Sequence, residues 1–266
     1  TCFEDIIAIN ALYRPGPLDS GMVDDFITRK RNPAKIQYVH PLLEPILKDT
    51  LGVIVYQEQV MLIAQNLARF SLAEADKLRK AMGKKIPEII AQMEGKFLKG
   101  ASENKIEKKT AKEIFDTIEK FARYGFNKSH SAAYAVITFQ TAYLKAHYPV
   151  EYMCALLSAT GDQDDVTKYV NDCRENGIQV LPPDINHSEF NFSIENDSIR
   201  FGLGAIKGIG EKAIESIIKA RSSGSFNSIA DFFDNIDLFS VNRGAVESLI
   251  KAGAFDSLHP GRAQLF

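Results

Sequence analysis

Apolar residues recur every three or four positions along most of the chain, which is the spacing of a helix with one buried face. This pattern predicts helices over residues 3–12, 22–31, 56–68, 72–82, 87–99, 103–121, 151–158 and 166–175. Ser71 and Glu74 have the spacing of a capping box, and Gly83 suits the C-cap of the same helix. We therefore expect a mainly α-helical fold.

The stretch from Ser131 to Leu144 differs from the others because it carries no charge, and Pro149 ends the run soon afterwards. It is too short, and too often interrupted by Ser, Thr and Gln, to span a membrane. We predict a helix that is buried on nearly every side and that has Ser129 or Ser131 as its N-cap.

Strand signals are sparse. Residues 190–194 and 198–201 alternate in polarity on either side of Glu195-Asn196-Asp197, which predicts a β-hairpin. A short strand that ends at Pro182-Pro183 indicates a link between two parts. We therefore expect a helical domain over residues 1–178 and a second region over residues 179–266.

Composition sets only broad limits. The 266 residues are 45% hydrophobic and 25% charged, which is typical of a globular protein. The three cysteines show no paired spacing and predict reduced thiols in a cytoplasmic protein. The chain starts with Thr1 and shows no signal peptide, so we expect a piece of a longer polypeptide. Residues 1–150 carry 22 Lys+Arg against 17 Asp+Glu and the rest carry 10 against 17, which favours an anionic partner for the first half.

Two groups of polar residues could bind phosphate. One surrounds the predicted end of the fourth helix and consists of Lys77, Arg79, Lys80, Lys84 and Lys85. The helix dipole explains one or two cations there but hardly five, so we favour phosphate binding for this group. The lysines at 105, 108, 109 and 112 alternate with acids, and we interpret them as a solvent face with i, i+4 pairs rather than a DNA contact.

The second group precedes the uncharged helix and comprises Asn127, Lys128, Ser129 and His130. Unpaired N–H groups at a helix start bind phosphate readily, although composition alone favours a simple capped helix with an incidental lysine. Gln57, Glu58 and Gln59 stand at another helix start, where polar groups usually serve as caps.

A third candidate site follows the hairpin. Gly208-Ile209-Gly210, with Lys207 and Lys212 beside it and an apolar helix after it, is similar to a helix-hairpin-helix motif. Its exposed N–H groups would bind a DNA phosphate without reading sequence, and a plain turn is the alternative. A degenerate second copy over residues 241–255 is expected to pack rather than contact DNA.

No catalytic or metal site is evident. The five histidines are scattered without triad or metal-ligand spacing. The acidic run at Asp162, Asp164 and Asp165 allows a metal hypothesis, but a helix N-cap is the better interpretation.

Several of these motifs, in this order, resemble one family. The run YGFNKSHSAAYA from Tyr124 is similar to the fingers motif of the C-family polymerases, the alpha subunits of bacterial replicative DNA polymerase III. Further similar stretches are ALYRPGPLDSGMVDDFITRK from Ala11, GVIVYQEQVMLIAQNLA from Gly52, ADKLRKAMGKK from Ala75, VLPPDIN from Val180 and GLGAIKGIGEKAI from Gly202. The resemblance covers essentially the whole chain.

The resemblance implies a multi-helical fingers domain followed by a small β-hairpin and a helix-hairpin-helix module. It implies that Arg79 faces the triphosphate of an incoming dNTP, that His130 lies near its sugar, and that Gln57, Glu58 and Gln59 line the nucleotide side. Lys80 stands where the family has a second arginine, so its grip on phosphate is weaker. The implied partners are primer-template DNA, a sliding clamp and other replisome subunits.

The family's catalytic aspartates, which bind two Mg²⁺ ions, belong to a palm domain upstream of this segment. We therefore expect this chain to be inactive by itself. Two other functions stay open. A helix-hairpin-helix repair enzyme would need a base-flipping pocket with a catalytic carboxylate or lysine, and none is evident. A purely structural helical domain would have no salt-dependent affinity for DNA.

Overall fold

A computed structural model describes residues 2–122 and 124–266. Within this described part the protein is mainly α-helical, with a single three-stranded sheet, and the predicted fold class is confirmed. By contacts the chain divides into two compact units, Thr1–Gln140 and Thr141–Phe266. The expected domain division after residue 178 stays a prediction.

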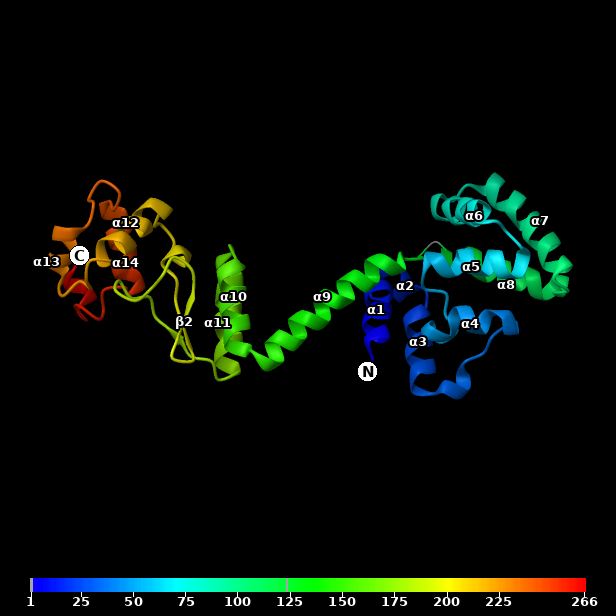
Figure 1. Cartoon of the computed structure of the whole chain (residues 1–266), viewed down its shortest axis with the longest axis horizontal. Coiled ribbons are helices and arrows are strands. Elements are labelled where there is room, and N and C mark those ends of the chain that lie inside the picture. The colour runs from blue at the N-terminus through cyan, green and yellow to red at the C-terminus, as the bar shows by residue number, and fades with distance from the viewer. Residues whose placement is uncertain (1, 123) are drawn as a thin grey trace. The chain divides into compact units, whose positions relative to one another are not determined.

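The first unit is built from helices alone (Figure 1). Its α-helices are α1 Phe3–Leu12, α2 Pro15–Asp19, α3 Met22–Arg31, α4 Glu44–Leu47, α5 Gln57–Ala68, α6 Leu72–Lys84, α7 Pro87–Glu103, α8 Lys108–Ala122 and α9 Lys128–His147. Short 3₁₀ turns cover Pro33–Lys35, Pro41–Leu43 and Lys48–Thr50. Because α9 extends beyond Gln140, its last turns belong to the second unit.

The core of the first unit lies between α5, α6, α7 and α8 (Figure 1). The rings of Phe97 and Phe115 are fully buried there, with centroids 5.4 Å apart. Helices α5 and α7 approach closely at Gly100, where a Cβ would lie 2.0 Å from the carbonyl oxygen of Ala68. Only glycine fits at this crossing.

Two predicted helix boundaries were wrong. Helix α6 continues through Gly83 and ends at Lys84, and its C-cap Lys85 takes the left-handed conformation with φ +54°. Glu103 is the last residue of α7 rather than the first of the next helix, because the chain turns at Lys105, with φ +60°, before α8 begins. A local turn of this kind leaves no signal in the hydrophobic period.

The predicted central helix is present as α9, but the prediction that it is buried on nearly every side was wrong. Among its described residues only Ser131 and Ala135 are buried, whereas Tyr134 and Ile137 are 55% and 54% exposed. An uncharged sequence does not require burial, since more than half of a typical protein surface is apolar.

The second unit begins with two packed helices and a small sheet. Its remaining elements are α10 Pro149–Ala159, α11 Gln163–Glu175, β1 Val180–Leu181, β2 Ser193–Glu195, β3 Ser198–Arg200, α12 Glu211–Arg221, α13 Ile229–Asn235 and α14 Arg243–Ala252, with 3₁₀ turns at Leu203–Ala205 and Arg262–Gln264. The predicted hairpin is confirmed as β2 and β3, which turn through Asn196 and Asp197 at φ 48° and 61°. Strand β1 adds to β3 in parallel, giving the order β1-β3-β2.

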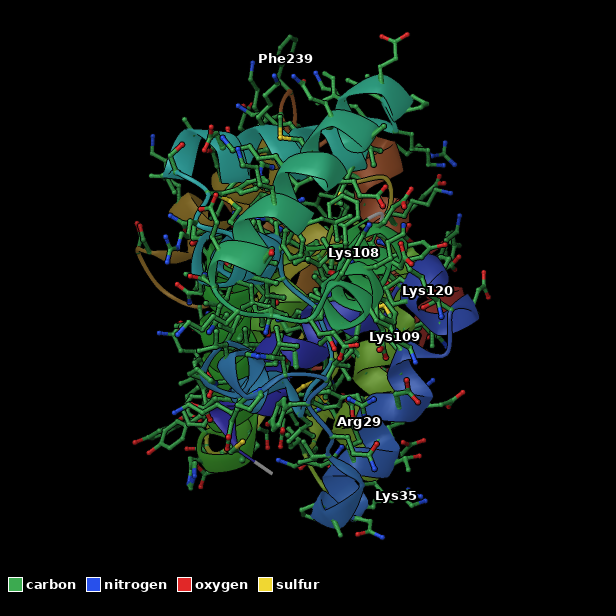
Figure 2. The ribbon with its side chains drawn as sticks, turned by 90° about the vertical axis from the view of Figure 1, so that its right-hand side faces the viewer. Arg29, Lys35, Lys108, Lys109, Lys120 and Phe239 are labelled. Atoms are coloured by element: carbon green, nitrogen blue, oxygen red, sulfur yellow. The ribbon has the colours of Figure 1, made fainter. Side chains whose placement is uncertain are left out.

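Two further predictions are confirmed. The side chain of Asp162 caps α11 by accepting a hydrogen bond from the N–H of Asp164, so the acidic run is a helix start. The lysines at 105, 108, 109 and 112 are all exposed, and Lys112 forms an i, i+4 ion pair with Asp116, so they line a solvent face (Figure 2). No helix in residues 2–122 or 124–266 is long and apolar enough to cross a membrane.

Candidate phosphate and nucleic-acid sites

Members of both predicted phosphate-binding groups bond to the start of α5, Arg79 from one group and Asn127 and Lys128 from the other. The side chain of Gln57 accepts a hydrogen bond from Arg79 Nη1 at 3.0 Å and donates one to the carbonyl oxygen of Gly125 at 3.1 Å. The next residue, Glu58, accepts hydrogen bonds from the side chain of Asn127 and from the backbone N–H of Lys128. Residues far apart in sequence therefore form one polar cluster.

One carboxylate, that of Asp76, pairs with two of the cations of α6. Asp76 accepts hydrogen bonds from Arg79 Nε at 3.0 Å and Nη2 at 2.6 Å, and it pairs with Lys80 Nζ at 2.7 Å. Hydrogen bonds from Lys80 and Arg79 hold the pKa of the Asp76 carboxyl below its usual range. In contrast, Lys77, Lys84 and Lys85 are exposed, and no described carboxylate pairs with them.

The start of α9 differs from the prediction in one detail. Asn127, rather than Ser129 or Ser131, is the N-cap, because its side-chain oxygen accepts a hydrogen bond from the N–H of His130 at 2.8 Å. Ser131 is instead fully buried, and its hydroxyl donates to the carbonyl oxygen of Ile7. Ser129 is exposed on the first turn of the helix.

Lys128 and His130 contact aromatic rings beside this helix start. Lys128 Nζ lies 5.5 Å from the centre of the Tyr56 ring and 3.8 Å from a carboxylate oxygen of Asp49. The imidazole of His130 lies between Phe126 and Tyr134, with ring centroids 5.4 and 4.7 Å away. Burial raises the pKa of the Tyr56 phenol, and nearby Asp49 adds to this shift, so Tyr56 stays neutral.

Gln59 has a different environment from its two neighbours. It is only 5% exposed, and its side-chain oxygen accepts hydrogen bonds from the N–H groups of Val55 and Tyr56. Its amide nitrogen donates to the hydroxyl of Thr50 at 2.7 Å. Gln59 therefore ties the chain before α5 to the preceding turn, whereas Gln57 and Glu58 contact the start of α9.

The helix-hairpin-helix turn of the second unit, residues 207–212, leaves backbone donors without a described acceptor. Gly208 has φ +92° and Gly210 forms the N-cap of α12 without a side-chain cap. Among the described residues, none accepts a hydrogen bond from the backbone N–H groups of Ile209, Gly210, Glu211 or Lys212. The side chains of Lys207 and Lys212 flank these donors and are exposed. This arrangement suits a phosphate oxygen.

In the second copy of the helix-hairpin-helix motif, a side chain caps the start of the helix. Helix α14 starts at Asn242, whose side chain accepts a hydrogen bond from the N–H of Ala245 at 3.0 Å. Two turns along, the hydroxyl oxygen of Ser248 would lie 2.8 Å from a Cβ at Gly208, so the two hairpin copies pack together there. Phe239, in the loop before α14, is 96% exposed (Figure 2).

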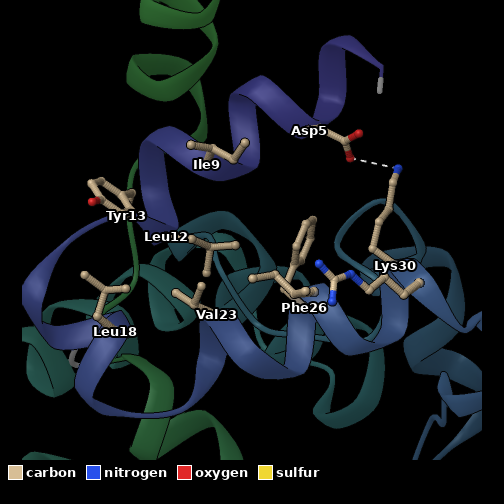
Figure 3. A pocket seen from close by; sticks show the side chains of 10 residues that line it. Asp5, Ile9, Leu12, Tyr13, Leu18, Val23, Phe26 and Lys30 are labelled. Atoms are coloured by element: carbon tan, nitrogen blue, oxygen red, sulfur yellow. Dashed lines mark ion pairs between the residues drawn. The ribbon is translucent and has the colours of Figure 1, made fainter.

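An apolar groove was not predicted from sequence. It has a volume of about 450 Å³ and lies between α1, α2 and α3, where Ile9, Leu12, Tyr13 and Phe26 line it (Figure 3). At one end Lys30 Nζ lies 2.8 Å from a carboxylate oxygen of Asp5. Burial acts to raise the pKa of Asp5, but the hydrogen bonds from Lys30 and Cys2 outweigh it and lower that pKa well below its usual range.

The described residues offer no metal site, and two of the three thiols are buried. No group of three or more His, Cys, Asp or Glu side chains in residues 2–122 and 124–266 could hold a metal ion. The described residues therefore do not fit the Mg²⁺ ions that the resemblance implies. Burial raises the pKa of the Cys154 and Cys173 thiols, which makes both poor nucleophiles.

Two family models and several curated relatives match the sequence of the chain. Residues 1–105 match the model of the bacterial DNA polymerase III alpha subunit finger domain, and residues 177–265 match that of the helix-hairpin-helix motif. The chain is 51% identical over 267 residues to the DNA polymerase III subunit alpha of Pseudomonas aeruginosa, covering 97% of this chain and 23% of the relative. It is 51% identical to the DNA polymerase III subunit alpha of Vibrio cholerae, covering 99% of this chain and 24% of the relative. It is 50% identical to the DNA polymerase III subunit alpha of Escherichia coli, covering 99% of this chain and 23% of the relative. The chain thus spans about a quarter of the length of these relatives.

Proposed function

Because the chain belongs to the bacterial DNA polymerase III alpha subunits, as their finger and helix-hairpin-helix regions, we propose that it serves template-directed DNA synthesis in replication. In this role the first unit binds the phosphates of the incoming dNTP and the second binds the backbone of primer-template DNA. The proposal places this work in the cytoplasm, within a longer polypeptide that also contacts a sliding clamp and other replisome subunits.

The observation that carries the nucleotide role is the link that Gln57 makes between Arg79 and the segment leading into α9. Arg79, Lys80, Lys84 and Lys85 come from one helix end, and Asn127, Lys128, Ser129 and His130 come from another, yet Gln57 and Glu58 connect both groups. A triphosphate carries several negative charges, so a site that gathers cations and helix N–H groups suits it.

The chemistry of nucleotidyl transfer is assigned to groups outside the described residues. Mg²⁺, held by carboxylates elsewhere in the longer polypeptide, would supply the charge stabilisation that phosphoryl transfer needs. The residues of this chain would bind and orient the triphosphate. By itself the chain is expected to be inactive, as the sequence predicts.

The DNA role depends on the first helix-hairpin-helix turn, residues 207–212, here called the open hairpin because no side chain caps the helix that follows it. Lys207 and Lys212 flank four N–H groups that have no described acceptor, those of Ile209, Gly210, Glu211 and Lys212, while the second hairpin copy is capped by Asn242. Contacts of this kind bind phosphates and do not discriminate sequence, which suits an enzyme that must copy every template.

Binding of the chain to a labelled primer-template duplex, measured by fluorescence anisotropy at several salt concentrations, tests the DNA role. We expect the affinity to fall with salt, and a Lys207→Ala/Lys212→Ala variant to bind more weakly with the salt slope reduced by about 2. Lys219→Ala, at the opposite end of α12, is the matched control and should change little. A folded double variant that binds as the starting chain does would contradict the assignment of DNA binding to the hairpin.

The same experiment separates the other two functions. A structural helical domain would show no salt-dependent binding, and a repair enzyme would process damaged DNA without further polypeptide.

For the nucleotide role, Arg79→Ala in the full-length polymerase polypeptide that carries this segment should raise the KM for dNTP. An unchanged KM would overturn that role.

A further inference from the structure

We propose that Gln57 is a positioning residue that couples Arg79 to the segment leading into α9, an inference that rests on the proposed nucleotide function. The amide of Gln57 bridges two elements. Its oxygen Oε1 accepts from Arg79 Nη1 at 3.0 Å, and its nitrogen Nε2 donates to the carbonyl oxygen of Gly125 at 3.1 Å. No other described side chain bonds both to a cation of α6 and to this segment.

The chemistry of the two contacts fixes the amide in one orientation. A guanidinium only donates hydrogen bonds and a carbonyl oxygen only accepts them, so the amide oxygen must face Arg79 and the amide nitrogen must face Gly125. A carboxylate could serve only the first contact and an alkyl chain neither. Both bonds are partly buried, which limits competition from water.

The backbone of Gln57 strengthens the connection. Its N–H donates to the carbonyl oxygen of Phe126 at 2.9 Å, and the N–H of Phe126 donates to the carbonyl oxygen of Val55 at 3.1 Å. Gln57 thus bonds to two consecutive carbonyls, those of Gly125 and Phe126. These residues immediately precede Asn127, the N-cap of α9, so a displacement of this segment would also move the Gln57 amide and Arg79.

The contact also fixes the guanidinium of Arg79. Of its five N–H groups, one on Nε and one on Nη2 bond to Asp76, and one on Nη1 bonds to Gln57. One N–H on Nη1 and one on Nη2 are left without a described acceptor. A guanidinium held on two sides loses less rotational freedom when it binds phosphate oxygens, which raises affinity through preorganisation.

The experiment uses the full-length polymerase polypeptide that carries this segment. Steady-state incorporation on a primer-template, with dNTP varied, gives kcat and KM for Gln57→Ala. We expect the KM to rise about tenfold, because a hydrogen bond to a charged group is lost, with a smaller change in kcat. Gln65→Ala is the matched control, since Gln65 is a half-buried glutamine of the same helix whose side chain contacts no described polar partner. Thermal unfolding checks that each variant is folded.

Two more variants test the coupling itself. Gln57→Glu keeps an acceptor for Arg79 but cannot donate to Gly125 at neutral pH, so we expect it not to restore the KM. Full restoration would overturn the bridge. If Gln57 acts through Arg79, the Gln57→Ala/Arg79→Ala variant should have a KM close to that of Arg79→Ala alone, and fully additive losses would contradict the inference.

The outcomes for the two proposals are distinct. If Arg79→Ala leaves the KM unchanged, the nucleotide function itself fails. If Arg79→Ala raises the KM but a folded Gln57→Ala does not, only the positioning role fails. A lower melting temperature for Gln57→Ala with an unchanged KM would show that Gln57 is purely structural, and would also overturn the inference.

Discussion

The carboxylate of Glu58 accepts two hydrogen bonds from the backbone N–H of Lys128, at 3.2 and 3.1 Å, across 70 positions of sequence. It thereby occupies the same N–H group that a phosphate would use at the start of α9. Asp76 engages Arg79 and Lys80 in a similar way, and Asp49 lies near Lys128. A triphosphate bound here would therefore compete with Glu58 for the N–H of Lys128, whereas Arg79 keeps two N–H groups without a described acceptor.

Glu58→Ala should destabilise the first unit. The carboxylate stabilises the positive end of α9 and accepts from Asn127, so we expect the free energy of unfolding to fall by about 1 kcal/mol. Urea unfolding followed by circular dichroism gives the value. Glu113→Ala on α8 is the control, because Glu113 is exposed and its side chain has no described partner. Equal losses in the two variants would show that the contact across to α9 contributes nothing.

The two glycines of the open hairpin should respond differently to alanine. Gly208 has φ +92°, and a Cβ there would lie 2.8 Å from the hydroxyl oxygen of Ser248, so Gly208→Ala should lower the free energy of unfolding by about 1–3 kcal/mol. Gly210 has φ −85° and no atom within 4 Å of the added carbon. Gly210→Ala should therefore be nearly neutral. Chemical denaturation of both variants tests this, and a neutral Gly208→Ala would contradict the predicted packing against α14.

Acid should weaken the start of α6 through Glu74. A hydrogen bond from Lys96, with further bonds to Ser71, lowers the pKa of Glu74 from 4.5 to about 2. A carboxyl whose pKa is lower in the folded protein stabilises it fully above the unfolded pKa, and this contribution disappears as the pH falls from about 4.5 through about 2.

Unfolding measured between pH 6 and pH 2 tests this effect. We expect Glu74→Gln to lose less stability than the starting protein on going from pH 5 to pH 2.5, because the glutamine cannot be protonated there. Lys96→Met removes the other partner of the ion pair, so it should also reduce the loss of stability between pH 5 and pH 2.5. Superimposable profiles for all three proteins would show that the pair does not influence folding.

Local sequence was enough to predict most elements. Hydrophobic period located the helices, the capping box at Ser71 fixed the start of α6, and the turn at Asn196 and Asp197 fixed the hairpin. These signals act between residues a few positions apart, so the sequence carries them directly. The order of the motifs likewise indicated the polymerase family, which the comparisons bear out.

Side-chain partners were decided only by the tertiary structure. On sequence grounds Gln57, Glu58 and Gln59 have the same interpretation, yet the side chain of Gln59 is buried and bonds to Thr50, whereas Gln57 bonds to Arg79 and Glu58 bonds to Lys128. Sequence also predicted a buried α9 that is largely exposed. Burial and hydrogen-bond partners depend on residues that lie far apart along the chain, so the local spacing of apolar residues does not predict them. The sequence by itself thus determined the helices and the motifs, whereas packing determined that Arg79 and the segment leading into α9 bond to the same side chain, that of Gln57.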